Sequence, residues 1–355
     1  YVDANGGAAR FNFVEGIAFT GGNLYAMDGD NAVIRKIGVA APNAVSTYVG
    51  AARQAGIQNS NGTDGATARF SRPMAIDTDG AGNVYVADWA NHTIRKAAVA
   101  SANGSYTAEV TTPAGQAGAA SNANVGTPTA GASANFNHPH CVRFVAPSTL
   151  LVCDHDNDAI RAVDLSSPSF TVSPYATGLP SAPEGLAPMA NGDLYFTAAD
   201  NRVYLWDHVE RKARALWGSP TGGVGSMDGG GLAATFHQPI GIAFDGDHAL
   251  YVADHLNDTL RRIDLTSGAV TTVAGIAGQQ GATDGALGTS LLWLPWQLTW
   301  HDGAVYVADG GSYTIRRYDP QSGNLSTVLG TPTQGGFRAG PVPGFLSDPA
   351  QVTFL

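Results

Sequence analysis

Three titratable side chains occupy one equivalent place in a repeated pattern of this 355-residue sequence. In the segments FVEG, HPHC and APEG, Glu15, His140 and Glu184 stand at the position that follows the Pro anchor of the repeat, where another copy carries Ile240; in the first segment Val14 occupies the place of the proline. Two carboxylates and one imidazole can bind zinc or manganese, or calcium if backbone oxygens join them. If their segments meet, the sequence predicts one divalent-cation site, calcium or zinc, able to polarise a carbonyl or activate water. The alternative is that the carboxylates face water and His140 is a hydrogen-bonded wall residue.

A second group of aromatic and imidazole side chains could contact a partner. Some of them directly follow aspartates that end strands, at one equivalent turn position, and others lie close to the Pro anchors. Such side chains can stack on a sugar or contribute to a protein interface. The alternative is that they are ordinary turn and packing residues. The candidate binding residues are Trp89, His138, His155, His237, His255 and Trp296.

The elements that position these residues come from an internal repeat. The phrase NVYVADWANHTIRK at residues 83–96 returns as LYVADHLNDTLRRI, VYVADGGSYTIRRY and LYAMDGDNAVIRKI, with more divergent copies LVCDHDNDAIRAV and LYFTAADNRVYLW. Each copy is preceded by a short apolar strand and a turn and is followed by another strand, giving four short strands per unit. This pattern predicts an all-β, six-bladed β-propeller of four-stranded antiparallel blades. The first strand of each blade lines the central channel, where the residues after the Pro anchors converge.

The whole chain, residues 1–355, is expected to form one propeller domain. A further first strand at 345–355 either closes the ring or begins a seventh, incomplete blade, and we favour six blades. The six predicted blades span residues 9–50, 68–115, 134–178, 181–218, 234–275 and 290–330.

Within the repeated phrase, each residue type has a physical reason. Val84 and Val86 alternate with Tyr85 and Ala87, which predicts a strand packed on both faces, as between stacked sheets. The aspartate that follows is expected to cap the turn through its carboxylate. The asparagine of this turn is expected to tolerate left-handed backbone. These two are Asp88 and Asn91, and the arginines expected to pair blade to blade are Arg35, Arg95, Arg161, Arg261 and Arg316.

The segments VYVADWANHTIRK and LYVADHLNDTLRRID resemble the NHL repeat, and the match covers nearly the whole chain. The long links NGTDGATARF, SMDGGGLAATF and ATDGALGTSLL look like those of secreted bacterial members. EGIAF and PEGLAP look like the Glu-Gly entry of the gluconolactonase family, in which that Glu binds a metal. PHCV is similar to the Pro-His step of peptidyl-hydroxyglycine lyases, which bind zinc through several histidines. These resemblances imply a metal-dependent hydrolase or lyase as one reading of Glu15, His140 and Glu184.

The composition of the chain limits the classes of partner that it can bind. The formal net charge is −10, and only Lys36, Lys96 and Lys212 are lysines. No basic run interleaves with aromatic residues and no apolar segment has the length of a membrane span, which argues against nucleic acid and membrane insertion. Cys141 and Cys153 flank a hairpin and lie on neighbouring strands, either as a disulfide or as two reduced thiols.

Function is bounded by these observations. The first hypothesis is a secreted, periplasmic or cell-surface scaffold that binds a protein or glycan through its rim and loops. The second is a metal-dependent lyase or lactonase at the channel mouth, and the third is a structural module of a larger surface protein. Whether the chain is an enzyme stays open, and no catalytic residue is assigned.

Overall fold

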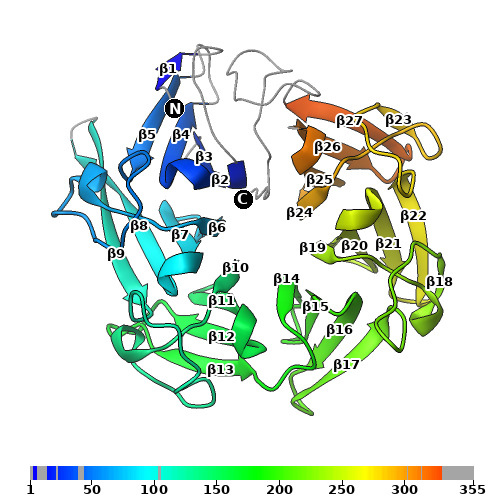
Figure 1. The fold of residues 1–355 in the computed structure, drawn as a ribbon, viewed down its shortest axis with the longest axis horizontal. Helices are drawn as coiled ribbons and strands as arrows, with labels where there is room; N and C mark the ends of the chain where they lie inside the picture. The colour runs from blue at the N-terminus through cyan, green and yellow to red at the C-terminus, as the bar shows by residue number, and fades with distance from the viewer. Residues whose placement is uncertain are drawn as a thin grey trace. The chain divides into compact units, whose positions relative to one another are not determined.

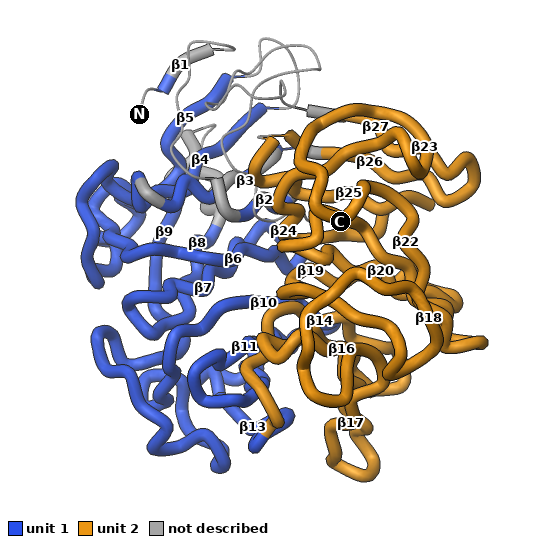
Figure 2. Tube along the Cα trace, turned by 45° about the vertical axis from the view of Figure 1, so that its right-hand side comes forward, with its two compact units in different colours: residues 1–178, 338–341, 355 blue, residues 179–337, 342–354 orange. Residues whose placement is uncertain are grey.

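Six antiparallel sheets of four or five strands make up the described part of the chain. The computed structural model describes residues 3–5, 14–20, 23–38, 44–102, 105–301, 303–312 and 314–329. We number the sheets as blades one to six in chain order (Figure 1). Figure 2 colours two compact units, of which unit 1 holds blades one to three and unit 2 holds blades four to six. The fold is the six-bladed β-propeller predicted from the sequence, and the segment 345–355 lies outside the described residues.

The described residues of unit 1 form thirteen strands. Blade one has β1 (Ala4–Asn5), β2 (Val14–Thr20), β3 (Asn23–Asp28), β4 (Val33–Gly38) and β5 (Ala44–Val49). Blade two has β6 (Pro73–Thr78), β7 (Asn83–Asp88), β8 (Thr93–Ala102) and β9 (Ser105–Ala114). Blade three has β10 (Pro139–Val145), β11 (Thr149–Asp154), β12 (Ala159–Asp164) and β13 (Val172–Ala176). Within this unit β6 packs against both β2 and β10.

Unit 2 repeats the arrangement. Blade four has β14 (Pro183–Pro188), β15 (Leu194–Ala198), β16 (Arg202–Asp207) and β17 (Lys212–Trp217). Blade five has β18 (Gly229–Gly230), β19 (Pro239–Phe244), β20 (Ala249–Asp254), β21 (Thr259–Asp264) and β22 (Ala269–Gly275). Blade six has β23 (Gly285–Ala286), β24 (Pro295–His301), β25 (Ala304–Asp309), β26 (Thr314–Asp319) and β27 (Asn324–Leu329). Here β19 packs against both β14 and β24.

The second strand of a blade is buried on both faces, as the sequence predicted. In β7, every residue after Asn83 is buried, and in β20 all six residues are buried. Apolar side chains from neighbouring blades of one unit meet in shared clusters, for example Ile76 and Val86 of blade two with Met27 and Tyr48 of blade one. Burial on both faces explains why the repeated phrase carries almost no charge before its aspartate.

The glycines after the Pro anchors allow first strands to approach closely. A Cβ at Gly185 would lie 2.3 Å from the carbonyl oxygen of Ile240, and one at Gly241 would lie 2.3 Å from that of Trp296. Both contacts are to backbone atoms of the next blade. In the Pro-x-Gly order, the residue after the proline keeps its side chain. The glycine that follows has no Cβ, so the first strand of the next blade can pack closely against it.

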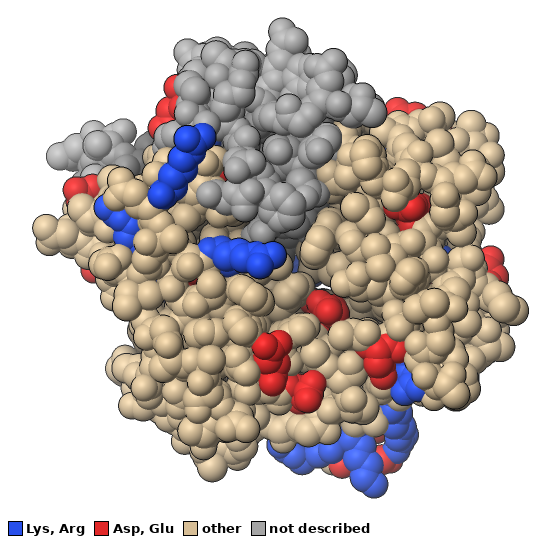
Figure 3. Space-filling view, viewed as in Figure 1, with Lys and Arg blue, Asp and Glu red and all other residues tan. Residues whose placement is uncertain are grey.

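Charged side chains are sparse on the face drawn in Figure 3, where uncharged side chains cover most of the described surface. Among the described residues, none of the helices combines the length and the apolar composition that a membrane crossing needs. The low proportion of charged residues in the sequence is thus visible at the surface.

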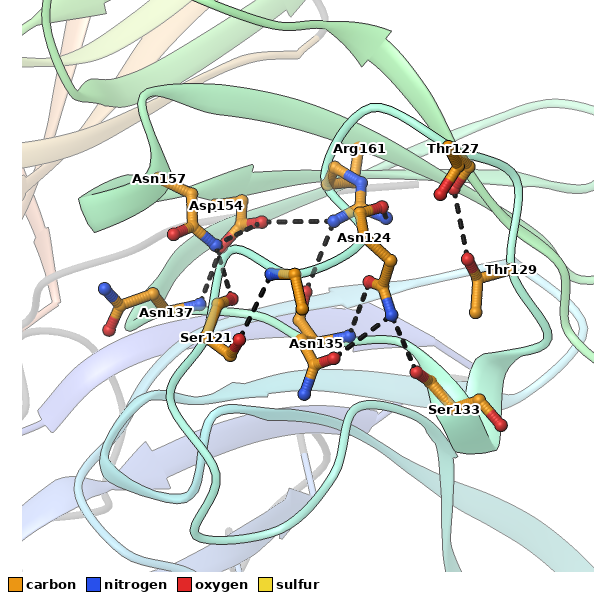
Figure 4. Close-up of polar contacts among 11 residues, drawn as sticks. Ser121, Asn124, Thr127, Thr129, Ser133, Asn135, Asn137, Asp154, Asn157 and Arg161 are labelled. Atoms are coloured by element: carbon orange, nitrogen blue, oxygen red, sulfur yellow. Dashed lines mark hydrogen bonds and ion pairs between the residues drawn. The ribbon is translucent and has the colours of Figure 1, made fainter.

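A buried aspartate–arginine pair recurs in five blades. The aspartate ends the second strand, the arginine lies on the third strand, and their N–O distances are 2.7 to 3.3 Å. In blades two, three, five and six the aspartate also accepts a backbone N–H from the residues just before the first strand, for example that of Asn137 onto Asp154 (Figure 4). The five pairs are Asp28–Arg35, Asp88–Arg95, Asp154–Arg161, Asp254–Arg261 and Asp309–Arg316.

These arginines do not pair blade to blade as the sequence suggested. Each binds the aspartate of its own blade and reaches with its other nitrogen to the link before that blade. Arg95 donates to the carbonyl of Gln58, and Arg261 to the carbonyl of Met227 and the carboxylate of Asp228. The physical reason is that a buried guanidinium needs several acceptors at once, and carbonyls of the link supply them.

The turn after the second strand also differs from the prediction. Asp88 gives no cap hydrogen bond to the 3-10 helix η4 (Trp89–Asn91). Its carboxylate instead accepts from the side chains of Asn91 and Arg95 and from the backbone N–H of Ser71. The left-handed residue is His92, with φ 57°, one position later than expected. Asn91 is helical because its amide is used to hold Asp88.

Blade four lacks the buried aspartate–arginine pair and forms four strands nonetheless. Arg202 occupies the beginning of β16 and donates to the carbonyl of Ser219. Asp200 accepts from the Tyr204 hydroxyl at 2.6 Å and from Arg202 at 3.3 Å. This half-exposed network replaces the buried ion pair of the other blades.

A disulfide joins Cys141 of β10 to Cys153 of β11. Their Cα atoms lie 4.9 Å apart, and both side chains are buried. The bond lies at an irregularity in the register, between the pairs Pro139–Asp154 and Val142–Val152. Of the two states that the sequence left open, the structure shows the disulfide.

Candidate binding site

The predicted cation ligands belong to two different units. Glu15 lies in β2, and its side chain falls outside the described residues. His140 is a half-buried residue of β10 in unit 1, with its ring centre 5.4 Å from that of His155. Glu184 is a buried residue of β14 in unit 2. Their sharing of one cation stays a prediction.

Unit 1 brings together five side chains that could bind a ligand, and we call them the histidine cluster: Trp89, His92, His138, His155 and Asp156. His92 is buried, with 8% of its surface exposed, and the other four are at least partly exposed. The Asp156 carboxylate bridges two imidazoles, with Oδ2 2.5 Å from Nδ1 of His138 and Oδ1 2.6 Å from Nδ1 of His155. The side chains of His138 and His155 are 28% and 24% exposed, and that of Asp156 is 41% exposed. The cluster is therefore both ordered by hydrogen bonds and open to solvent.

The repeat fold explains why these side chains meet. Trp89 and His155 begin equivalent 3-10 helices, η4 of blade two and η6 (His155–Asn157) of blade three. His138 directly precedes β10 in left-handed backbone with φ 51°. Its N–H donates to Nδ1 of His92, 3.1 Å away, and so links blade two to blade three.

Ring contacts fix the orientation of His138. Its ring stacks on that of Trp89, with centroids 4.0 Å apart, and the Arg72 guanidinium lies 5.0 Å from the Trp89 centroid. The ring of His92 lies 4.6 Å from that of His138. Trp89 was predicted as a stacking platform for a sugar or partner, but its ring is engaged by two side chains of the protein. We therefore assign it the role of supporting His138.

Hydrogen bonding determines which ring nitrogens carry protons. Because the Asp156 carboxylate can only accept when ionised, neutral His138 and His155 carry the proton on Nδ1 and the lone pair on Nε2. His92 accepts at Nδ1, so its proton is on Nε2. Burial alone would raise the pKa of Asp156, but the hydrogen bonds from His138 and His155 outweigh burial and lower it. Burial lowers the pKa of His92, with His138 adding to the effect.

In unit 2 the predicted residues have different surroundings. His255 begins η8 (His255–Asn257) but is only 6% exposed, because the Trp296 ring packs against it with centroids 4.7 Å apart. Its Nδ1 donates to the carbonyl oxygen of Pro295 at 3.1 Å. His237 is half-buried, and its N–H donates to Asp254. His255, a candidate binding residue from the sequence, is therefore not open to a partner, because its neighbour in the next blade is a large aromatic residue.

Burial also sets the protonation of His255. It lowers the pKa of this imidazole to about 4, against the hydrogen bond to Pro295 and the nearby charge of Glu184, which both raise it. His255 is thus neutral at physiological pH, with its proton on Nδ1. This residue is suited to packing and not to exposed recognition.

Two members of the histidine cluster were not singled out from the sequence. His92 occupies the left-handed position after η4, and Asp156 is the second residue of η6. A signal was present for His92, since Asp158, Asn201 and Asp258 occupy its position in other blades, also with positive φ. Asn201 and Asp258 likewise accept the N–H that precedes the next first strand.

Comparison with known proteins bears on the family. No protein-family model matches the chain. Over 111 residues, 28% of the chain, it is 33% identical to NHL repeat-containing protein 2 of Gallus gallus, and the match covers 15% of that protein. Together with the six blades, this match decides the repeat type. The chain is an NHL-repeat β-propeller.

The NHL propeller also matches a second curated protein. Over 247 residues, 61% of the chain, it is 28% identical to Protein SUPPRESSOR OF QUENCHING 1, chloroplastic, of Arabidopsis thaliana, and the match covers 23% of that protein. The chain thus spans less than a quarter of the length of either curated relative.

Solved structures share the fold at low identity. A structural genomics protein of Bacteroides thetaiotaomicron superposes with a TM-score of 0.64 at 15% identity, covering 94% of this chain and 76% of that one. An auxiliary nutrient binding protein of the same organism gives 0.60 at 12% identity, covering 96% and 94%. Virginiamycin B lyase of Staphylococcus aureus gives 0.58 at 12% identity, covering 94% and 88%. At this identity the likeness establishes the NHL propeller's fold alone.

Proposed function

We propose that this NHL propeller is an extracellular scaffold that binds a neutral glycan through the histidine cluster of unit 1. The observation that carries the proposal is the Asp156 carboxylate, which holds His138 and His155 at 2.5 and 2.6 Å in a half-exposed position. Such a bridge keeps two imidazoles in one orientation and one tautomer without burying them. Ordered polar groups of this kind are what sugar hydroxyls require, because each hydroxyl both donates and accepts.

The tautomers define the complementary ligand. Nε2 of His138 accepts and Nε2–H of His92 donates, and the two rings are 4.6 Å apart. Neighbouring hydroxyls of one sugar ring can satisfy such an acceptor and donor together. The Arg72 guanidinium beside Trp89 offers further donors at the edge of the cluster.

Two observations support an extracellular setting. Structural disulfides persist mainly in oxidising compartments, and Cys141–Cys153 is buried within blade three. The auxiliary nutrient binding proteins of Bacteroides thetaiotaomicron and Bacteroides ovatus share the fold over 96% and 98% of this chain. A glycan partner is favoured over a protein at this cluster because, among the described residues of unit 1, only Ile57 is an exposed large apolar side chain.

The test is calorimetric binding to a panel of neutral polysaccharides and oligosaccharides, with a uronic-acid polymer for comparison. For any neutral glycan bound by the wild type, Asp156→Ala should weaken binding at least about tenfold, because both imidazoles lose their common acceptor. Since Asp156 is exposed, this variant should retain the wild-type melting temperature.

His248→Gln is the matched control. It disrupts an exposed histidine–aspartate contact of the same kind in blade five, His248 with Asp247 at 2.7 Å, and should leave glycan binding unchanged. Absence of binding to every neutral glycan, or equal affinity of wild type and Asp156→Ala, would show that the cluster is not a glycan site. Capture of a protein through the cluster would also overturn the proposal.

The metal-dependent lyase or lactonase and the structural-module hypotheses stay predictions. The first is tested by the metal content of protein purified without chelators, comparing wild type with Glu15→Ala and His140→Ala. Loss of near-stoichiometric metal in both variants would favour the enzyme hypothesis, and metal unaffected by either change would contradict it.

A further inference from the structure

Two aspartates and a histidine meet at one end of blade four. Asp193 directly precedes β15, Asp207 is the last residue of β16, and His208 follows it. The ladder between these strands ends at the pair Leu194–Trp206, so Asp193 and Asp207 face each other one step further along. We call Asp193, Asp207 and His208 the blade-four triad.

The ligand atoms of the triad are close enough to share one ion. One carboxylate oxygen of each aspartate and one ring nitrogen of His208 all lie within 4.8 Å of one another. In the part of the chain that the structure describes, no other group of three His, Cys, Asp or Glu side chains meets this condition. The histidine cluster of unit 1 does not, although it contains more imidazoles. Neighbouring ligands around a first-row divalent ion are about 3 Å apart, and His208 Nδ1 lies 2.9 Å from Asp193 Oδ1.

The two carboxylates of Asp193 and Asp207 carry like charges that a bound cation would neutralise. Like charges directly opposite each other on neighbouring strands destabilise a sheet. Neither carboxylate forms an ion pair with a lysine or arginine among the described residues, whereas the strand-ending aspartate Asp254 is neutralised by buried Arg261. Within the described ranges, the half-exposed carboxylates of the triad have only His208 and neutral donors as partners.

Other blades of the same unit show that the second carboxylate is particular to blade four. Asp264 and Asp319 correspond to Asp207, and each also accepts backbone N–H groups of the turn that follows. The residues opposite them are Ala249 and Ala304. An aspartate is thus needed at the strand end for the turn, but an aspartate opposite it is not needed for the fold.

We propose that the blade-four triad binds one first-row divalent cation, with Zn²⁺ as the representative ion. One imidazole nitrogen and two carboxylate oxygens are a ligand set suited to zinc, with water completing the coordination. The ion takes the place of the proton between His208 Nδ1 and Asp193 Oδ1, while the neutral imidazole moves its proton to Nε2. Oδ1 of Asp207 accepts from Val209 and Glu210, which leaves Oδ2 for the metal.

Bound metal would fasten the turn between β14 and β15 to the end of β16. Gly192 of this turn has φ +93°, and a Cβ there would lie 3.2 Å from the His208 ring. Glycine at this position therefore leaves room for the imidazole. Blade four is the blade without a buried aspartate–arginine pair, and a metal would supply this blade with a cross-link at the opposite end of the β15–β16 ladder.

The test is calorimetric titration of the intact chain with Zn²⁺ at pH 7.5, together with melting temperatures with and without the ion. The wild type should bind one Zn²⁺ through the triad and melt at a higher temperature when it is bound. Asp193→Ala and His208→Gln should each weaken this binding at least about tenfold and abolish the increase. Asp193→Ala should fold, because alanine occupies this position in blades five and six.

Asp264→Ala is the matched control, since it removes the corresponding turn aspartate of blade five, and its Zn²⁺ affinity should equal that of the wild type. The proposal is overturned if the wild type shows no saturable binding, or if Asp193→Ala and His208→Gln bind as the wild type does. Zinc binding that is lost only in His138→Gln would assign the metal to the histidine cluster and would equally overturn it.

Discussion

Burial gives different chemistry to two histidines that occupy the same place in the repeat. His155 and His255 both follow a strand-ending aspartate. His155 is held by Asp156 and is 24% exposed, whereas His255 is covered by Trp296 and hydrogen-bonded to Pro295. The neighbouring side chains decide the role of each, and these come from other segments of the chain. A repeat position alone therefore does not define a binding residue.

At this scale we predict that His255 makes stability depend on pH. Its folded pKa, about 4, lies below the ordinary value of 6.5. The unfolded chain therefore takes up a proton first as the pH falls, so the contribution is complete above pH 6.5 and is lost as the pH falls toward 4. The loss attributable to this group is at most about 3 kcal/mol. Chemical denaturation of wild type and His255→Gln between pH 4 and 8 measures the difference.

Comparison with the variant is necessary because other groups act in the opposite direction. Burial raises the pKa of Asp254 to about 6 despite Arg261, so its contribution to stability decreases as the pH rises from about 4 to 6. This contribution is common to both proteins and cancels in the difference. Equal pH dependence in wild type and His255→Gln would show that His255 is not the responsible group.

At the scale of elements, the repeat in the sequence was sufficient to predict the strands but not the conformation of the turns. Alternation and turn residues predict four strands per blade, because a strand buried on both faces leaves a continuous apolar signal. The shift from Asn91 to His92 as the left-handed residue could not be read from the phrase. It depends on the hydrogen bond from the Asn91 amide to Asp88, and so on side-chain geometry. The histidine cluster was found in part, since Trp89, His138 and His155 were candidates.

The glycines of the first strands provide a prediction at this scale. Gly241→Ala places a Cβ 2.3 Å from the Trp296 carbonyl oxygen and 2.8 Å from the Gln297 Cα, both backbone atoms. Because β19 and β24 must separate to accept it, we expect a loss of about 1–3 kcal/mol in the free energy of unfolding. Gly230→Ala is the control, since no atom lies within 4 Å of its Cβ and its φ of −91° suits alanine. Urea denaturation of both variants provides the measurement, and equal stability would contradict the close-packing argument.

At the scale of the whole molecule, charge separates the possible partners. The formal net charge of −10 comes with only nineteen lysines and arginines in 355 residues. Five of the arginines are buried in ion pairs and do not contribute a surface for phosphates. Recognition by the histidine cluster instead uses imidazoles and one bridging carboxylate. This combination favours neutral ligands over polyanions.

The final prediction concerns salt. Binding driven by lysine and arginine contacts to phosphates or sulfates weakens steeply as salt rises, because counter-ions are released on binding. Hydrogen bonds between neutral imidazoles and sugar hydroxyls involve no such release. For a glycan bound through the histidine cluster, we therefore expect the dissociation constant to change less than about threefold between about 50 and 500 mM NaCl. We expect no binding of heparin or double-stranded DNA at either concentration. Calorimetry at the two salt concentrations measures glycan and heparin binding, and gel-shift assays measure DNA binding. A steep loss of glycan affinity with rising salt would indicate that a charged ligand group or a basic surface carries the interaction.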